Sequence, residues 1–191
     1  MVGYKVWLAA IILACSAGVS AAPGADGNAI GGSAVSALDN TPLFGVRVEV
    51  AQAQQVNDMT RDPDGVYTLK VPTSIKEFDL RYVKDGYLDW VDPKITNDQD
   101  HQKRPVARLV PKLGLSTLSD TKILSLAVEA SETGKRGQEL SATDKQAGAV
   151  LVESAQKNLK LILNESTVDS TVHTIVKASM DNISKFSQTG D

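Results

Sequence analysis

Alternation of apolar and polar residues in the first half of the chain constrains its fold more than any other feature. Residues 45–50 read Gly-Val-Arg-Val-Glu-Val, so that a valine occupies every second position. Successive side chains of a β-strand point to opposite faces of a sheet, and this two-residue period therefore predicts a strand with one buried face. Residues 66–72, Val-Tyr-Thr-Leu-Lys-Val-Pro, repeat the period after the turn-forming sequence Asp-Pro-Asp-Gly.

Further alternating segments follow the same rule and are separated by turn-forming residues. Phe78, Leu80 and Tyr82 alternate with Asp79 and Arg81, which we expect on the polar face of the sheet. We also expect strands at residues 30–38, 46–52 and 105–111, a polar hairpin end at 54–58, and a polar loop between Trp90 and residue 100. Short strands at such intervals are typical of an all-β sandwich.

From residue 113 the apolar period changes from two residues to three and four, which predicts helices. We expect Ser119 to cap a first helix and two glycines, Gly134 and Gly137, to end it. Ser141 and Asp144 have the spacing of a capping box at the start of a second helix. A small helical C-terminal region, residues 113–191, therefore follows the sandwich.

A third helix is predicted to begin at Ser166 or Thr167 and to carry Val172 and Ile175 on its apolar stripe. The apolar stripes need a partner, which leaves three arrangements open: an antiparallel hairpin, packing on the sandwich, or packing on another subunit. We interpret the stripe around Val172 and Ile175 as core rather than as a docking face.

Residues 1–22 have the pattern of an export signal. Lys5 precedes an apolar run from residue 6 to residue 14, and small residues follow at 19–21. The run is shorter than the roughly 20 apolar residues that cross a bilayer. We therefore expect an exported protein, periplasmic or secreted.

Cys15 is the single cysteine of the chain, so no disulfide forms within it. Its setting, Ile-Leu-Ala-Cys-Ser, is similar to a bacterial lipobox, in which the thiol is acylated and anchors the protein to a membrane. The alternative, which we favour, is that Cys15 is an apolar member of a signal that is removed. A membrane contact is expected only if Cys15 is lipidated.

Charge and residue spacing argue against several function classes. The formal net charge of −3 gives no basic field to attract nucleic acid. His101 and His173 lie in different predicted units, which disfavours a zinc site, and Pro63 interrupts the ligand run of a calcium loop at residues 62–65. The chain has no Gly-x-Ser-x-Gly sequence. We therefore expect no enzyme activity, no cofactor and no metal site.

Four segments carry a resemblance to a known family: residues 30–32 (Ile-Gly-Gly), 42–48 (Pro-Leu-Phe-Gly-Val-Arg-Val), 64–72 (Asp-Gly-Val-Tyr-Thr-Leu-Lys-Val-Pro) and 84–87 (Lys-Asp-Gly-Tyr). In order and spacing they resemble the carboxypeptidase regulatory-like domain, a transthyretin-like, seven-stranded sandwich grouped with carbohydrate-binding-like folds. The resemblance covers about residues 28–112 and implies a Greek-key sandwich without active-site residues. Ala34 and Ser36 depart from it, since the family usually has a valine and often an aspartate there.

The resemblance implies a non-catalytic, exported binding or structural module of the bacterial cell envelope. We expect it to contact proteins through the sandwich loops and the helical region, or to self-associate through that region. The alternative is a glycan-binding accessory subunit in which Tyr87 and Trp90 stack on sugar rings. Both aromatic side chains are equally explained as core, which we favour, and an enzyme of another type has the least support.

Overall fold

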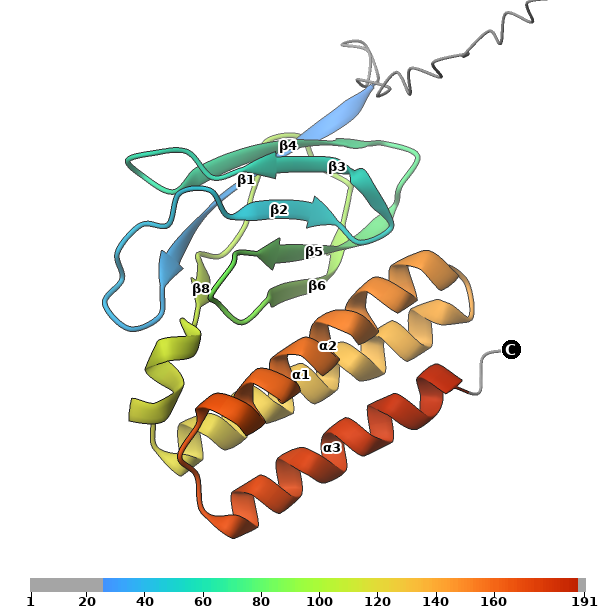
Figure 1. The fold of residues 1–191 in the computed structure, drawn as a ribbon. Coiled ribbons are helices and arrows are strands. Elements are labelled where there is room, and N and C mark those ends of the chain that lie inside the picture. The colour runs from blue at the N-terminus through green and yellow to red at the C-terminus, as the bar shows by residue number, and fades with distance from the viewer. Residues whose placement is uncertain (1–25, 189–191) are drawn as a thin grey trace, which may run out of the picture.

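The computed structural model describes residues 26–188, which form two β-sheets followed by three helices (Figure 1). One sheet contains β1 (Gly27–Ser36), β4 (Val66–Pro72), β7 (Gln102–Lys103) and β8 (Ala107–Leu109). Within it, β1 pairs antiparallel with β4 and parallel with β7 and β8.

The second sheet is antiparallel and has the strand order β3-β2-β5-β6. It contains β2 (Arg47–Val50), β3 (Ala53–Met59), β5 (Glu77–Val83) and β6 (Trp90–Thr96). A 3₁₀ helix, η1 (Lys112–Thr117), leads from β8 to α1 (Asp120–Ser141), α2 (Lys145–Glu165) and α3 (Ser170–Gln188).

A single apolar cluster takes side chains from both sheets. The alternation in β4 and β5 is confirmed, because every second residue of each strand faces this cluster and is almost fully buried. Its largest members are Ile30, Tyr67, Leu69, Phe78, Leu80, Tyr82, Ile95 and Leu109. Burial of such side chains is the main favourable term in folding, so this cluster holds the two sheets together.

The predictions for two polar segments are wrong, because both segments are strands. Residues 54–58 form most of β3, and residues 90–96 form β6. Both strands lie at the edges of their sheet. An edge strand has one solvated side and tolerates polar residues and Pro93, so its sequence shows less of the apolar alternation.

The helix starts are set by three side-chain caps. Ser119 caps α1 as predicted, since its side chain accepts a hydrogen bond from the Lys122 N–H. Asp144, rather than Ser141, caps α2 by accepting from the Ala147 N–H at 3.0 Å. For α3 the predicted start is wrong, because Asp169 accepts from the first N–H groups of the helix. An aspartate side chain is among the best acceptors at this position.

The prediction that Gly134 and Gly137 end the first helix is wrong, because both lie buried inside α1. A Cβ atom on Gly137 would lie 2.8 Å from the carbonyl oxygen of Gly148 in α2. The two helices therefore approach each other closely where these glycines meet. Glycine is needed at these positions because a side chain would not fit between the helices, and not because the backbone is left-handed.

The helices pack on each other and on the second sheet. Figure 1 shows α1 and α2 side by side along that sheet, with α3 on their far side. Their core includes Leu88 and Val110 from the strand region. On α3, Val172 faces this core as expected, but Val176 takes the place predicted for Ile175, which is exposed.

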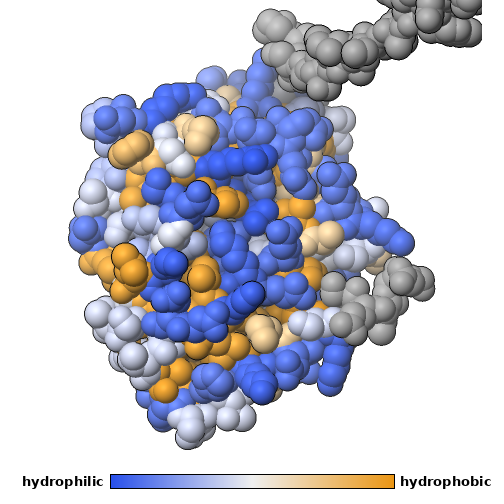
Figure 2. Space-filling view, viewed as in Figure 1, coloured by the Kyte–Doolittle hydropathy of each residue, from blue (hydrophilic) through white to orange (hydrophobic). Residues whose placement is uncertain are grey.

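The predicted export signal, residues 1–22, and Cys15 lie outside the described residues. Within residues 26–188, none of the helices has the length and apolar content to cross a membrane. The visible face is covered mainly by hydrophilic residues, with hydrophobic ones in small separate groups (Figure 2).

Candidate ligand-binding groove

The outer face of the second sheet is polar but buried beneath the helices. Asp79 lies on the polar face of the sheet, opposite the core residues of β5, yet it is 0% exposed, and Glu49 of β2 is 3% exposed. Buried carboxylates require opposite charges or hydrogen bonds to compensate for lost hydration. Glu49 finds these partners within the sheet, in Arg47 and Arg81, whereas Asp79 pairs with Arg136 of α1.

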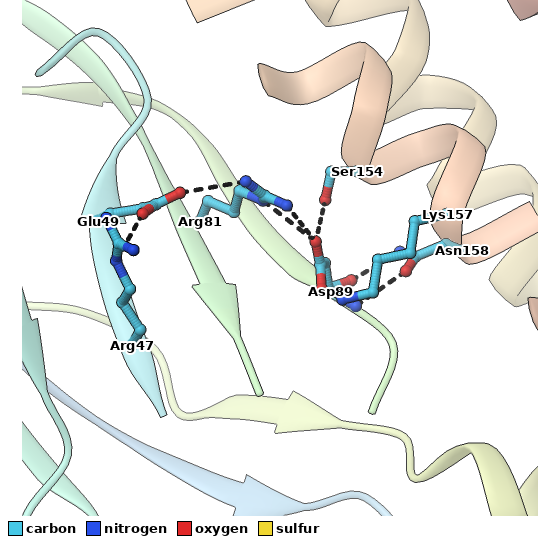
Figure 3. Close-up of polar contacts among 7 residues, drawn as sticks. All are labelled: Arg47, Glu49, Arg81, Asp89, Ser154, Lys157 and Asn158. Atoms are coloured by element: carbon cyan, nitrogen blue, oxygen red, sulfur yellow. Dashed lines mark hydrogen bonds and ion pairs between the residues drawn. The ribbon is translucent and has the colours of Figure 1, made fainter. Parts of the chain in front are cut away.

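Asp89, just before β6, accepts hydrogen bonds from both the sheet and α2 (Figure 3). Its carboxylate lies 2.7 Å from the Arg81 guanidinium, 2.9 Å from the Ser154 hydroxyl and 2.5 Å from the Lys157 ammonium. Arg81 also binds Glu49, at 3.2 Å. The Asp89 side chain has no exposed surface, so its negative charge is neutralised entirely within the protein.

Asn158 of α2 binds the backbone of the same residue. Its side-chain oxygen accepts from the Asp89 N–H at 2.8 Å, and its amide nitrogen donates to the Asp89 carbonyl oxygen at 2.7 Å. Ser154, Lys157 and Asn158 occupy positions i, i+3 and i+4 of α2, and such residues share one face of a helix. That face therefore holds both the backbone and the side chain of Asp89.

A second buried carboxylate attaches α1 to the sheet. The Arg136 guanidinium contacts Asp79 at 3.1 Å and Glu77 at 2.8 Å. Although burial opposes its charge, the hydrogen bonds and attraction of Asp79 and Glu77 raise the pKa of Arg136. Gln52 and the Lys94 N–H also donate to Asp79. Both long helices are thus fixed to the sheet by buried ion pairs.

Between these attachments lies a groove of about 230 Å³, bounded by β6, β8 and α1. Its lining combines an aromatic ring, apolar side chains and charged groups of both signs, including Trp90, Val91, Pro93, Arg108, Glu129, Thr133 and Arg136. Arg136 is committed to Asp79 and Glu77, whereas Glu129 on α1 and Arg108 on β8 are exposed. The groove therefore combines an aromatic surface with solvent-facing charges.

The structure separates the two aromatic residues predicted as ligand contacts. Trp90 is the first residue of β6, is half-buried, and lines the groove. Its ring meets Tyr82 edge-to-face at 5.0 Å. Tyr87 is also half-buried, and both rings pack against the core between the sheets. Trp90 alone of the two lines the groove, where a ligand can reach it.

The tyrosine beneath Trp90 belongs to a buried pair. The hydroxyl oxygens of Tyr67 and Tyr82 lie 2.6 Å apart. Burial raises the pKa of Tyr67 to about 12 and raises the pKa of Tyr82 further. Both phenols are therefore neutral at physiological pH and satisfy each other inside the core.

The two histidines are apart, as expected from the sequence. His101 is exposed in the loop before β7, and His173 is exposed on α3. Within residues 26–188, no three His, Cys, Asp or Glu side chains are grouped so that they hold a metal ion.

Sequence reasoning missed Asp89, Arg136 and Asn158. The available signal was that Ser154 and Asn158 interrupt the apolar side of α2 next to Leu151 and Leu159. Polar residues beside an apolar helix stripe indicate polar partners across an interface. No protein-family model and no curated protein matches this chain.

Proposed function

We propose that this chain is a non-catalytic, exported binding module of the bacterial cell envelope, and that the groove beside Trp90 is its contact surface. The observation that carries the proposal is a partly exposed aromatic ring that lines a concave site together with Arg108 and Glu129. Concave sites with an apolar surface and a few placed polar groups are typical of binding sites. The buried ion pairs of Asp79 and Asp89 keep the walls of the groove in place, which limits the entropy lost on binding.

We further infer that the two sheets close as a transthyretin-like, Greek-key sandwich of the carboxypeptidase regulatory-like kind. The apolar cluster common to both sheets supports this inference. So do the turn glycines of the resemblance, since Gly45, Gly65 and Gly86 all have positive φ. Such domains serve as contact modules, and the proposed role rests on this analogy.

Export follows from the predicted signal at residues 1–22 and is tested by cell fractionation. A tagged chain should appear outside the cytoplasm, and its mass should show cleavage after residue 21 or 22. Incorporation of a fatty acid that is abolished by Cys15→Ser would instead establish the anchored form. A full-length chain retained in the cytoplasm would contradict export.

Contact through the groove is tested by placing a photo-crosslinking amino acid at Thr133, inside the groove. The matched control is Thr174, an exposed threonine on α3. In intact envelopes the proposal predicts a discrete adduct from position 133 that is much weaker from position 174. An adduct of twice the chain's mass would identify self-association. Equal adducts from both positions, or none from position 133, would contradict the proposal.

Glycan binding is a second candidate because Trp90 lines the groove beside Arg108 and Glu129. A sugar ring stacks on an aromatic face while charged groups bind its hydroxyls. Titration with envelope oligosaccharides should then shift the Trp90 indole signal. Replacement of Tyr87 by Phe should leave this binding unchanged, since Tyr87 is not among the residues that line the groove.

A further inference from the structure

The groove lining contains charges that the protein neutralises itself and charges that it leaves to solvent. Asp89 is paired with Arg81 and Lys157, and Arg136 is paired with Glu77 and Asp79. Neither group has charge to offer a ligand. The charges that remain are the two carboxylates of Glu129 and Glu132 and the guanidinium of Arg108.

The two carboxylates stand together on one wall of the groove. Glu129 and Glu132 are three residues apart on α1 and are both exposed, so their side chains are neighbours on the helix surface. One oxygen of Glu129 accepts from the Ser125 hydroxyl at 3.3 Å, which leaves its other oxygen for a ligand. On β8, Arg108 donates to the side chain of Asn40. The exposed charge of the groove is therefore negative by one unit.

Trp90 adds a second feature that favours a cation. Its ring lines the same groove, and its edge-to-face contact with Tyr82 at 5.0 Å holds it in place. The face of an indole ring is negative and attracts ammonium and guanidinium groups, most strongly among the aromatic side chains. A guanidinium group additionally matches carboxylates through paired N–H donors.

We propose that this groove binds an arginine side chain presented by a partner protein. The guanidinium group stacks on Trp90 and donates to Glu129 and Glu132, while repulsion from the like charge of Arg108 restricts its position in the groove. This inference deepens the proposed function and rests on it, because it names the chemistry that a partner brings to the same groove.

The test is a nuclear magnetic resonance titration of the purified protein without residues 1–22, in which Trp90 is the single tryptophan and gives the single indole N–H signal. The probe is a capped Ala-Arg-Ala tripeptide, and its control contains citrulline, which has nearly the same shape without the charge. The inference predicts that the arginine peptide shifts the Trp90 signal and binds about tenfold more tightly than the citrulline peptide. Higher salt should weaken the arginine peptide alone.

Variants on α1 locate the contact. Glu129→Gln with Glu132→Gln should weaken arginine binding by about tenfold, whereas Glu139→Gln, an exposed glutamate of the same helix outside the groove lining, should not. Equal binding of the two peptides would overturn the inference, as would an equal effect of Glu139→Gln. An indole shift with neutral oligosaccharides alone would also overturn it and would leave the module a glycan binder. No shift with any probe, together with groove-specific crosslinking at Thr133, would overturn the arginine inference and preserve the proposed function.

Discussion

Asn158 binds the main chain of Asp89 as a neighbouring strand would, with its side-chain oxygen 2.8 Å from the N–H and its side-chain nitrogen 2.7 Å from the carbonyl oxygen. A helix residue thereby takes the place of a strand partner next to edge strand β6. The same turn of α2 holds the Asp89 carboxylate through Ser154 and Lys157. Asp89 therefore fixes the position of α2 on the sheet. The groove, which both Asp89 and Asn158 line, depends on the same contact.

Removal of the Asp89 charge should destabilise the protein strongly. Asp89→Asn leaves the buried Arg81 guanidinium and the Lys157 ammonium without their common anion, and we expect the free energy of unfolding to fall by about 3 kcal/mol. Urea denaturation followed by far-ultraviolet circular dichroism measures this. The control is Asp98→Asn, at an exposed aspartate, for which we expect a change below about 0.5 kcal/mol. Similar losses for both variants would show that Asp89 is not a buried anchor.

The close contact of α1 and α2 should not accept a methyl group at Gly148. A Cβ atom there would collide with the Ser141 hydroxyl and lie 2.6 Å from the carbonyl oxygen of Gly137. Gly148→Ala should therefore lower stability by about 2 kcal/mol, although alanine is the better helix former. Gly31→Ala is the control, since its Cβ would lie 3.6 Å from the nearest atom, and it should cost less than about 1 kcal/mol. A stabilised Gly148→Ala protein would contradict the close contact.

High pH should destabilise the fold through the buried tyrosine pair. The pKa of Tyr67 is raised to about 12 in the folded protein, so the unfolded chain loses this proton at lower pH than the folded one does. The stability that Tyr67 contributes is fully present below its unfolded pKa of about 10 and is lost as pH rises towards about 12. The unfolding free energy should fall by up to about 1.4 kcal/mol per pH unit in this window, with Tyr82 adding to the effect.

Urea denaturation at a series of pH values measures this dependence, with Tyr67→Phe as the comparison. The variant removes one titrating phenol and should show a shallower decline above about pH 10. It should also be less stable at neutral pH by about 1 to 2 kcal/mol, because the buried Tyr82 hydroxyl loses its partner. An unchanged pH dependence would show that Tyr67 ionises at its ordinary pKa.

Removal of the helical region should unfold the remainder instead of producing an independent domain. A chain ending at residue 112 would expose Leu88 and Val110 and would leave Asp79 and Asp89 without their helix partners. We expect it to lack the near-ultraviolet circular dichroism of a packed Trp90 and a cooperative urea transition. A shortened chain that is folded and stable would contradict this prediction, and a change from a dimeric full chain to a monomeric shortened chain would show that the helices serve assembly.

The apolar alternation of β4 and β5 was predictable, whereas the polar strands β3 and β6 were not. In β4, Tyr67, Leu69 and Val71 face the apolar cluster, and the residues between them are exposed, so the apolar alternation is regular. In β3 and β6 the exposed edge permits polar residues and Pro93, so local sequence and strand position conflict. Tertiary position, which a single sequence does not contain, decides these segments.

The candidate site was hidden because its charged residues have the sequence pattern of a solvated face. Asp79 and Arg81 alternate with core residues in β5, as outward residues of any half-buried strand do. Nothing within the strand indicates that α1 and α2 cover that face. Lys157 illustrates the same point, since its spacing from Glu153 favours an ion pair within the helix, yet its ammonium group binds Asp89 across the interface.

The groove exists only if the helices are docked on the sheet as described, and hydrogen exchange at the Asp89 amide tests this docking most directly. The acceptor of this N–H is the side chain of Asn158, 69 residues further along the chain. The account predicts slow exchange at Asp89, and selective acceleration there in Asn158→Ala while the neighbouring Leu88 N–H, bonded to the Val110 carbonyl, remains protected. Exchange at Asp89 as fast as in an unfolded chain would contradict the docking and the groove with it.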